Sequence, residues 1–364
     1  MSVSAPNRSR RVPSRPAEEV RVTSPAPRDA WEAALAADPH ALVTYTPAWT
    51  DFVCGAAGFE DASRLYELPR GRRLVLPTLR RRHLPRSLAV EASFPPSWGM
   101  GGIVSPGGLR PEDAAAVFAD LAGRDAIRMS LRPNPLHGET LRATRPPDAV
   151  TKPLLAHVLD LQGGFGRVWE SRFSGTARTA VRKAERSGLT VERDTSGRLV
   201  PVLYKLYDLS IDRWAAQQHE PRLLARWRGH RNDPRQKFEA LTRALNDTCR
   251  IWVAWCGTQP AAAILVLQGK NATYSRGMMD KELAGPTRAN YLLHQLAIEE
   301  ACEAGCRHYH MGESGFSASL AQFKTRFGAR PYAHAEYHFE RLPITALDRR
   351  ARGLAKRIVG FRDS

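Results

Sequence analysis

The feature of this sequence that most constrains its fold is an order of predicted elements that occurs twice. In the first half, two extended runs flank a turn at residues 69–72, and a helix at 111–121 and the strand AIRMSL follow. In the second half, IWVAWC and AAAILVLQ flank a turn at 257–259, followed by the strand NATYSRGMM, a helix at 288–304 and the strand RHYHM. This recurrence predicts a duplicated α/β domain with mixed, mostly antiparallel sheets flanked by helices.

Changes in composition indicate where the domains begin and end. The Pro-rich segment RPPDAVTKP separates the halves, so we expect a first domain at residues 29–150 and a second at 151–345. Residues 1–28 are rich in Pro, Ser and Arg and too poor in apolar residues to build a core, which predicts a disordered lead. Residues 346–364 form a basic C-terminal tail.

Positive charge indicates a polyanionic partner. The chain has 54 Lys and Arg against 37 Asp and Glu, a formal net charge of +17, although a role in solubility alone is an open alternative. In the predicted helix of FSGTARTAVRKAERSGL, alanines form one narrow face and basic residues cover the rest, namely Arg178, Arg182, Lys183 and Arg186. Guanidinium groups on such a face suit contacts with phosphate, and a solvated basic face is the alternative.

Several function classes lack their sequence signatures. Five scattered cysteines with no CxxC pair make a metal site improbable and are typical of reduced thiols in the cytoplasm. The N-terminal residues lack the apolar core of a secretory signal, and no apolar run is long enough to span a membrane. Motifs of P-loop nucleotide hydrolysis, dinucleotide binding, zinc proteolysis and serine hydrolysis are absent from the sequence.

The segment HMGESGFSASLAQFKTRFGARP contains the most distinctive candidate residue. Ser317 is a suitable N-cap and Gly328 a suitable end for a helix in which Phe323 and Phe327 share one face with Leu320. Lys324 then lies at the border of this apolar face. It is either a lysine that extends its ammonium into water or a cation directed at a reactive site.

At the level of whole motifs, the chain resembles the Fem-like transferases, which are built from two GNAT-type acyltransferase domains. The resemblance rests on FSGTARTAVRKAERSGLTVERD, YKLYDLSIDRW, the segment ATYSRGMM to HYHMGES, and LAQFKTRFGARP, and it covers roughly residues 40–340. It implies transfer of an aminoacyl group from aminoacyl-tRNA to an amine on a peptidoglycan precursor or a natural product. It also implies that Phe323 and Lys324 lie at the reaction centre, where Lys324 stabilises charge during attack on the ester.

Other site residues follow less directly. Glu313 and Asp208 are candidates for the general base. The residues expected to contact tRNA or an anionic acceptor are Arg178, Arg182, Lys183, Arg186, Arg276 and Trp98 of the glycine-rich loop SFPPSWGMGG. We expect no metal and no cofactor, since aminoacyl-tRNA acts as a co-substrate.

The identity of the acyl donor has an alternative. GNAT enzymes that use acyl-CoA usually hold its pyrophosphate on a glycine-rich loop, whereas the corresponding stretch here is MMDKELAGPTRANY, in which Gly285 precedes Pro286. Aminoacyl-tRNA is therefore the preferred donor and acyl-CoA the alternative. A non-catalytic RNA-binding protein on an acyltransferase scaffold is a third possibility.

Overall fold

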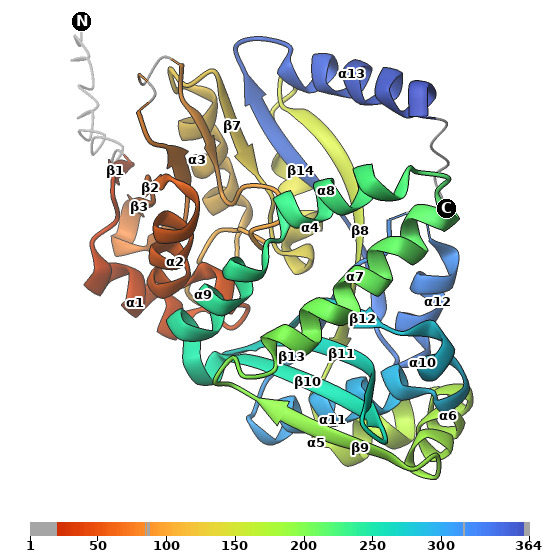
Figure 1. Ribbon diagram of the computed structural model, residues 1–364. Coiled ribbons are helices and arrows are strands. Elements are labelled where there is room, and N and C mark those ends of the chain that lie inside the picture. The colour runs from red at the N-terminus through yellow and green to blue at the C-terminus, as the bar shows by residue number, and fades with distance from the viewer. Residues whose placement is uncertain (1–19, 84, 86–87, 316, 360–364) are drawn as a thin grey trace, which may run out of the picture.

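The computed structural model describes residues 20–359 apart from residues 84, 86–87 and 316. A continuous 11-stranded sheet runs through both halves of the chain (Figure 1). Its strands are, in spatial order, β2 (Phe59–Asp61), β5 (Leu79–Arg81), β6 (Val90–Ala92), β7 (Arg128–Leu131), β14 (Arg330–Glu340), β8 (Val150–Asp160), β13 (His308–Glu313), β12 (Ala272–Met279), β11 (Gln259–Gln268), β10 (Cys249–Cys256) and β9 (Leu189–Asp194). A three-stranded sheet contains β1 (Arg21–Thr23), β3 (Arg64–Glu67) and β4 (Arg73–Leu76).

Helices cover both faces of the large sheet. The α-helices of the described residues are α1 (Arg28–Ala37), α2 (Pro47–Ala57), α3 (Pro111–Ala122), α4 (Gly138–Thr144), α5 (Gly164–Arg167), α6 (Gly175–Glu185), α7 (Val200–Gln217), α8 (Arg222–Asn232), α9 (Arg235–Leu245), α10 (Lys281–Thr287), α11 (Ala289–Glu303), α12 (Ala318–Arg326) and α13 (Ile344–Val359). Alternate residues of β11 point to opposite faces: Ile264 and Val266 pack against α6 and α11, and Leu265 and Leu267 against α7 and α9.

The predicted duplication is confirmed by the sheet topology. Within the described residues, β6 pairs with β7 and β12 pairs with β13 in parallel, and the other ladders are antiparallel. A helix connects the strands of each parallel pair, α3 in the first half and α10 with α11 in the second. The fold is therefore a tandem of two GNAT-like units with mixed, mostly antiparallel strands, as expected from the repeated order of elements.

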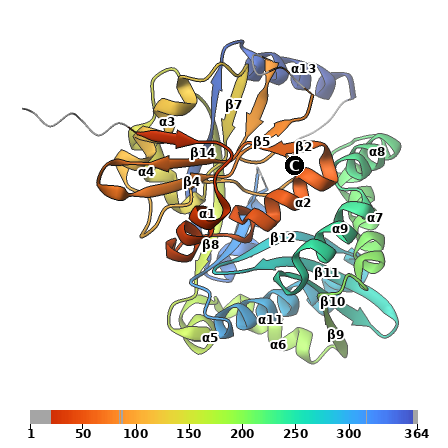
Figure 2. The same cartoon turned by 90° about the vertical axis from the view of Figure 1, so that its left-hand side faces the viewer.

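The two halves share strands and core. β14 pairs with β7 of the first half over residues 337–340 and with β8 over residues 330–338. Trp49 and Phe52 of α2 belong to the same apolar cluster as residues of α7 and α9, and Figure 2 shows α2 beside α9. The predicted boundary near residue 150 thus falls at the start of β8, in a sheet that continues across it, and the domain limits stay a prediction.

The two ends of the chain differ from expectation. The disordered lead was predicted to reach residue 28, but Arg21–Thr23 form β1 and pair with β3, so its predicted end is wrong. Residues 1–19 of that lead lie outside the described residues. The predicted basic tail is largely helical, since α13 occupies Ile344–Val359, and residues 360–364 lie outside the described residues. α13 follows β14 directly.

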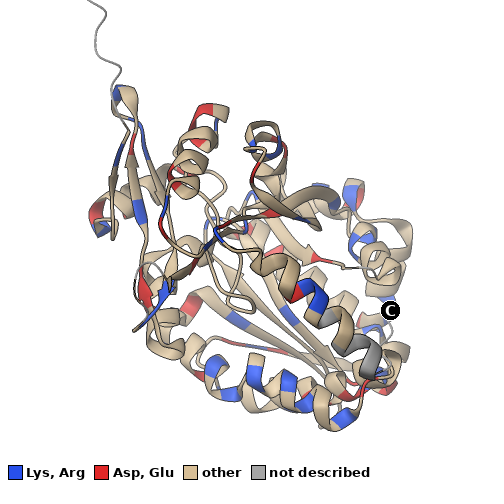
Figure 3. Cartoon of the chain, turned by 90° about the horizontal axis from the view of Figure 1, so that it is seen from above, with Lys and Arg blue, Asp and Glu red and all other residues tan. Residues whose placement is uncertain are grey.

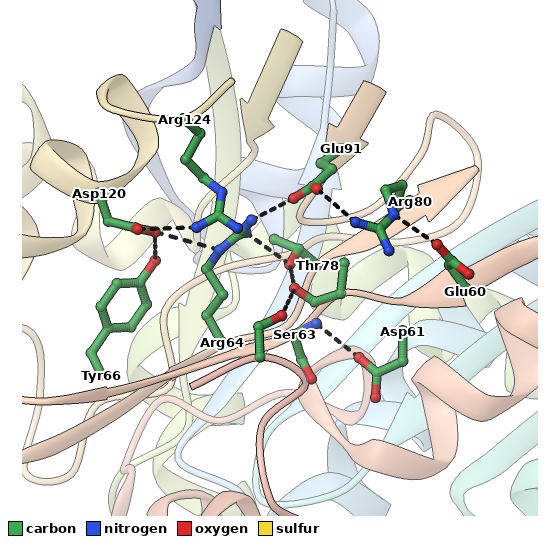
Figure 4. Close-up of polar contacts among 12 residues, drawn as sticks. Glu60, Asp61, Ser63, Arg64, Tyr66, Thr78, Arg80, Glu91, Asp120 and Arg124 are labelled. Carbon is green, nitrogen blue, oxygen red and sulfur yellow. Dashed lines mark hydrogen bonds and ion pairs between the residues drawn. The ribbon is translucent and has the colours of Figure 1, made fainter. Parts of the chain in front are cut away.

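A buried ion-pair network holds the first half together (Figure 4). The Arg64 side chain is fully buried and donates to a carboxylate oxygen of Glu91 at 2.5 Å and to the hydroxyl of Thr78 at 3.3 Å. Its Nε lies 3.4 Å from Asp120, which also accepts from the hydroxyl of Tyr66 at 2.8 Å. The network joins β3, β6 and α3. Its charged groups are paired with one another and therefore have a structural role.

Candidate functional site

A pocket opens where the parallel strands β12 and β13 separate. Their ladder contains only the pairs Ala272 with Tyr309 and Thr273 with His310, although β12 continues to Met279. The pocket has a volume of about 660 Å³ and is walled by α7, β12, α10, α11 and α12. Its lining includes Tyr274, Met278, Asn290, His294, Ser314 and Phe323.

Phe323 and Lys324 lie on α12, which begins where the sequence predicts. The Ser317 hydroxyl accepts from the backbone N–H of Leu320 at 3.3 Å and so caps the helix. The Phe323 ring lines the pocket and contacts the rings of Tyr291 and His294, with centroids 5.0 and 5.4 Å away. Lys324, one helical position further, faces inward from this wall.

Lys324 is not a lysine that extends into water. Its side chain is 2% exposed, and Nζ donates to the backbone carbonyls of Gly312 at 3.0 Å and Glu313 at 2.6 Å. Burial lowers its pKa to about 8, and the carboxylate of Glu313 opposes that shift. Lys324 is not itself a lining residue, whereas Phe323, which precedes it on α12, and Ser314, which follows Glu313 in the chain, line the pocket.

A bulge in β13 explains why two carbonyls are available to Lys324. The register of β13 against β8 shifts between His310 and Gly312, and Gly312 has a φ of 72°, a conformation that favours glycine. A bulge interrupts the regular ladder, so these carbonyl groups turn out of it and toward α12. The position of the ammonium group thus depends on backbone geometry rather than on a carboxylate partner.

His294 is a pocket residue that the sequence analysis missed. It is 1% exposed, lines the pocket, and its Nδ1 has no hydrogen-bond partner among the described residues. Burial, assisted by the positive charge of Lys324, lowers its pKa to about 3, so the imidazole is neutral at pH 7. α11 is buried over most of its length, including residues 291–295, so a buried histidine there is typical of a core residue and the sequence offers no signal of a pocket.

The two candidate bases occupy different places. Glu313 ends β13, and its carboxylate binds Arg132 at 2.5 Å, with Nε2 of His334 4.0 Å away. Asp208 on α7 instead binds Nε2 of His230 at 2.7 Å and does not line the pocket. Lys324 thus binds the backbone carbonyl of Glu313, while the carboxylate of Glu313 is paired with Arg132. Neither Glu313 nor Asp208 lines the pocket.

The predicted basic helix is α6, and its four basic residues are not equivalent. Arg178 donates from Nη1 to the carbonyls of Trp169, Glu170 and Phe173 at 3.1, 3.0 and 2.7 Å, so it stabilises the preceding turn. The other three basic residues are exposed, namely Arg182, Lys183 and Arg186. Of the four, only these three expose their charge to solvent.

Arg276 and Trp98 connect the two halves. Arg276 on β12 binds the carboxylate of Asp233 at 3.1 Å and donates to the carbonyl of Ser97 at 3.3 Å. The ammonium of Lys237 lies 4.2 Å from the centroid of a Trp98 ring and also binds Asp233 at 2.7 Å. Both predicted contact residues therefore hold the glycine-rich loop against α9 and β12, and neither lines the pocket.

Two absences within the described part of the chain bear on the site. No group of three or more His, Cys, Asp or Glu residues there is arranged to hold a metal ion. None of the helices in that part combines the length and the apolar character needed to cross a bilayer.

Comparisons with known proteins were made for sequence and for structure. Residues 171–333 match the family model of the acetyltransferase (GNAT) domain. The solved structure of FemX covers 90% of this chain and 99% of its own, with a TM-score of 0.62 and 12% identity. A conserved protein of unknown function from Bacteroides thetaiotaomicron VPI-5482 covers 87% and 99%, with a TM-score of 0.53 and 9% identity. A tandem GNAT protein from the clavulanic acid biosynthesis pathway covers 88% and 98%, with a TM-score of 0.42 and 12% identity. No curated protein matches the sequence.

These similarities confirm the predicted fold. Residues 171–333 match the acetyltransferase (GNAT) domain model, and the chain as a whole folds as FemX does. The matched segment contains both strands of the separated pair, the pocket wall on α11, and α12 with Phe323 and Lys324.

Proposed function

We propose that this chain, which carries a GNAT-type acyltransferase domain and has the fold of FemX, transfers an aminoacyl group from aminoacyl-tRNA to an amine and so forms an amide. The acceptor is the amine of a peptidoglycan precursor or of a natural product. Because aminoacyl-tRNA is made in the cytoplasm, we place the reaction there.

The observation that carries this proposal is the placement of Lys324. An ammonium group has three N–H donors, and two of them bind the carbonyls of Gly312 and Glu313. No described residue accepts from the third, while its neighbours His294 and Ser314 line the pocket. A cation held in place before the substrate binds stabilises a developing oxyanion without further reorganisation.

The chemistry then requires few protein groups. The acceptor amine attacks the carbonyl carbon of the 3′ ester, and the resulting oxyanion accepts the third N–H of Lys324. Collapse of this intermediate breaks the C–O bond, and the 3′ oxygen leaves with the proton that the nitrogen gives up. Glu313 is the candidate base for that proton transfer once its carboxylate leaves Arg132, and Phe323 shapes the acyl channel.

The start of α10 supports aminoacyl-tRNA over acyl-CoA as the donor. Residues 281–287, where a pyrophosphate loop is expected in acyl-CoA enzymes, are helical and include Pro286. The carboxylate of Asp280 accepts from the backbone N–H of Glu282 at 2.9 Å, so a negative charge already occupies this helix start. An anionic pyrophosphate would be repelled there, whereas the exposed basic residues of α6 suit tRNA phosphates.

Acyl-CoA is the second candidate donor. The family model that matches residues 171–333 is described as an acetyltransferase domain, and this description is the observation that favours it. In this alternative the same pocket and Lys324 would serve N-acylation in cell-envelope, polysaccharide or secondary-metabolite synthesis.

One experiment separates these functions. The protein is given radiolabelled aminoacyl-tRNA or labelled acetyl-CoA together with a panel of amines, and amide products are quantified. We expect product from aminoacyl-tRNA only. Product from acetyl-CoA alone would establish the second candidate, and tRNA binding without turnover would indicate a non-catalytic RNA-binding protein.

A further inference from the structure

Exposed leucines gather at one end of the molecule. Leu342, Leu347 and Leu354 in and before α13 are 56%, 58% and 61% exposed, and Leu88 is 51% exposed. Leu88 lies at the same end, because Ala89 accepts from the N–H of Ile127, whose carbonyl accepts from Arg341. Figures 1 and 2 show α13 at this end, directly after β14.

α13 has an apolar stripe that no described residue covers. Ile344, Leu347, Ala351 and Leu354 recur at intervals of three and four and therefore share one side of the helix. A helix that packed this stripe on the sheet would hide its leucines, yet Leu347 and Leu354 are more than half exposed. The carboxylate of Glu340 accepts from the backbone N–H of Thr345 at 3.1 Å, so the first turn is attached to β14.

Positive charge surrounds these leucines. Figure 3 looks down on this end and shows basic residues along α13. The exposed basic residues are Arg81, Arg82, Arg341, Arg349 and Arg350, and the exposed acidic residues are Asp125 and Asp348. An apolar stripe flanked by an excess of arginine is typical of a helix that lies in the interface of an anionic bilayer.

We propose that α13 and the adjoining ends of β5, β6 and β14 bind the surface of an anionic lipid bilayer. The leucines enter the boundary between headgroups and acyl chains, and the arginines contact lipid phosphates. RNA supplies phosphates but no apolar medium for the leucines, whereas a bilayer supplies both. The proposal does not depend on the proposed enzymatic function, because none of the residues of this surface lines the pocket.

Sedimentation of the full chain with lipid vesicles tests this proposal. We expect binding to phosphatidylcholine vesicles that contain about a third phosphatidylglycerol, weak binding to pure phosphatidylcholine, and loss of binding at high salt. Leu347→Glu with Leu354→Glu should reduce the partition coefficient by about tenfold or more. Leu223→Glu on α8, where the leucine is 84% exposed, is the matched control and should bind as the unaltered chain does.

Three outcomes would overturn the proposal. The first is that the double leucine variant binds anionic vesicles as strongly as the unaltered chain does, provided that the circular dichroism and Tm of the two proteins match. The second is failure of the chain to bind vesicles while Arg349→Ala with Arg350→Ala weakens binding to tRNA, which would make this end an RNA-binding surface. The third is a change of oligomeric state in the leucine variant without vesicle binding, which would make it a contact between copies.

Discussion

Replacement of Lys324 with methionine tests the proposed reaction centre most directly. The variant keeps an unbranched side chain in the buried site and removes the ammonium. Loss of one preplaced donor to an oxyanion lowers kcat by about 10²- to 10³-fold, equivalent to about 2.7–4 kcal/mol. Because the oxyanion forms only after the amine attacks, Lys324 stabilises the transition state rather than the bound substrate, and we expect KM for aminoacyl-tRNA to change little.

The structure also indicates that this variant should fold. Loss of the ammonium leaves the carbonyls of Gly312 and Glu313 without that donor, at about 1–3 kcal/mol each. Burial lowers the pKa of Lys324 from 10.5 to about 8, so the fold disfavours its charged form by about 3 kcal/mol, which the variant recovers. These opposing effects are of similar size, and the Tm should shift by only a few degrees.

Single-turnover kinetics with charged tRNA and a saturating amine measure the chemical step. Lys281→Met, an equal change at an exposed lysine on the rim of the same pocket, is the control and should keep kcat within about threefold. If Lys324→Met also stays within that range, Lys324 does not stabilise the oxyanion. If only KM rises, the lysine binds the ground state and the proposed mechanism is wrong.

Four further changes probe the remaining structural claims. With an acceptor amine of low pKa, kcat should fall as pH rises through about 8, because Lys324 must be protonated, and Lys324→Met should lack this limb. Arg182→Ala with Arg186→Ala should raise KM for aminoacyl-tRNA several-fold and flatten its salt dependence, with kcat nearly unchanged. Gly312→Ala should lower kcat without removing a functional side chain, because its φ of 72° is strained for alanine and the carbonyl that holds Lys324 would move. Arg64→Met should destabilise the fold by about 3–5 kcal/mol in denaturant melts, because it leaves buried carboxylates unpaired.

Each of these predictions has a contrary result. A rate that stays flat from pH 7 to about 10 would mean that the charge of Lys324 is not used. An unchanged KM in the α6 variant would make that face a solvated surface. Full activity of Gly312→Ala would show that the bulge in β13 does not contribute to catalysis. An unchanged denaturant melt for Arg64→Met would show that the ion-pair network of Figure 4 does not stabilise the fold.

Local chemistry explains which elements could be predicted. The hairpin of β10 and β11 and the cap of α12 depend on turn and capping residues adjacent in sequence, and both are confirmed. No helix was predicted at residues 281–287, a stretch that contains Gly285 and Pro286, yet these residues form α10, which Asp280 caps. β1 was not expected either, because three residues become a strand only when β3 is available to pair with them.

The sequence also predicted where single side chains lie on a helix, but not what they contact. The helical spacing placed Lys324 at the edge of an apolar face, but left both burial and exposure to water open. The separation of β12 from β13 and the bulge at Gly312 decide that the ammonium binds two backbone carbonyls. Likewise, the sequence does not distinguish Arg178 from Arg182. Only the structure shows that Arg178 donates to backbone carbonyls of the turn before α6 and so stabilises the fold.

The sequence by itself therefore determined the repeated order of elements, the helix that carries Phe323 and Lys324, and the positive charge, because spacing, capping and composition act between neighbours in the chain. The tertiary structure alone decided the pocket, the place of His294 within it and the inward direction of Lys324. These depend on where strands distant in sequence stop pairing, and burial and the availability of carbonyl partners follow from that geometry.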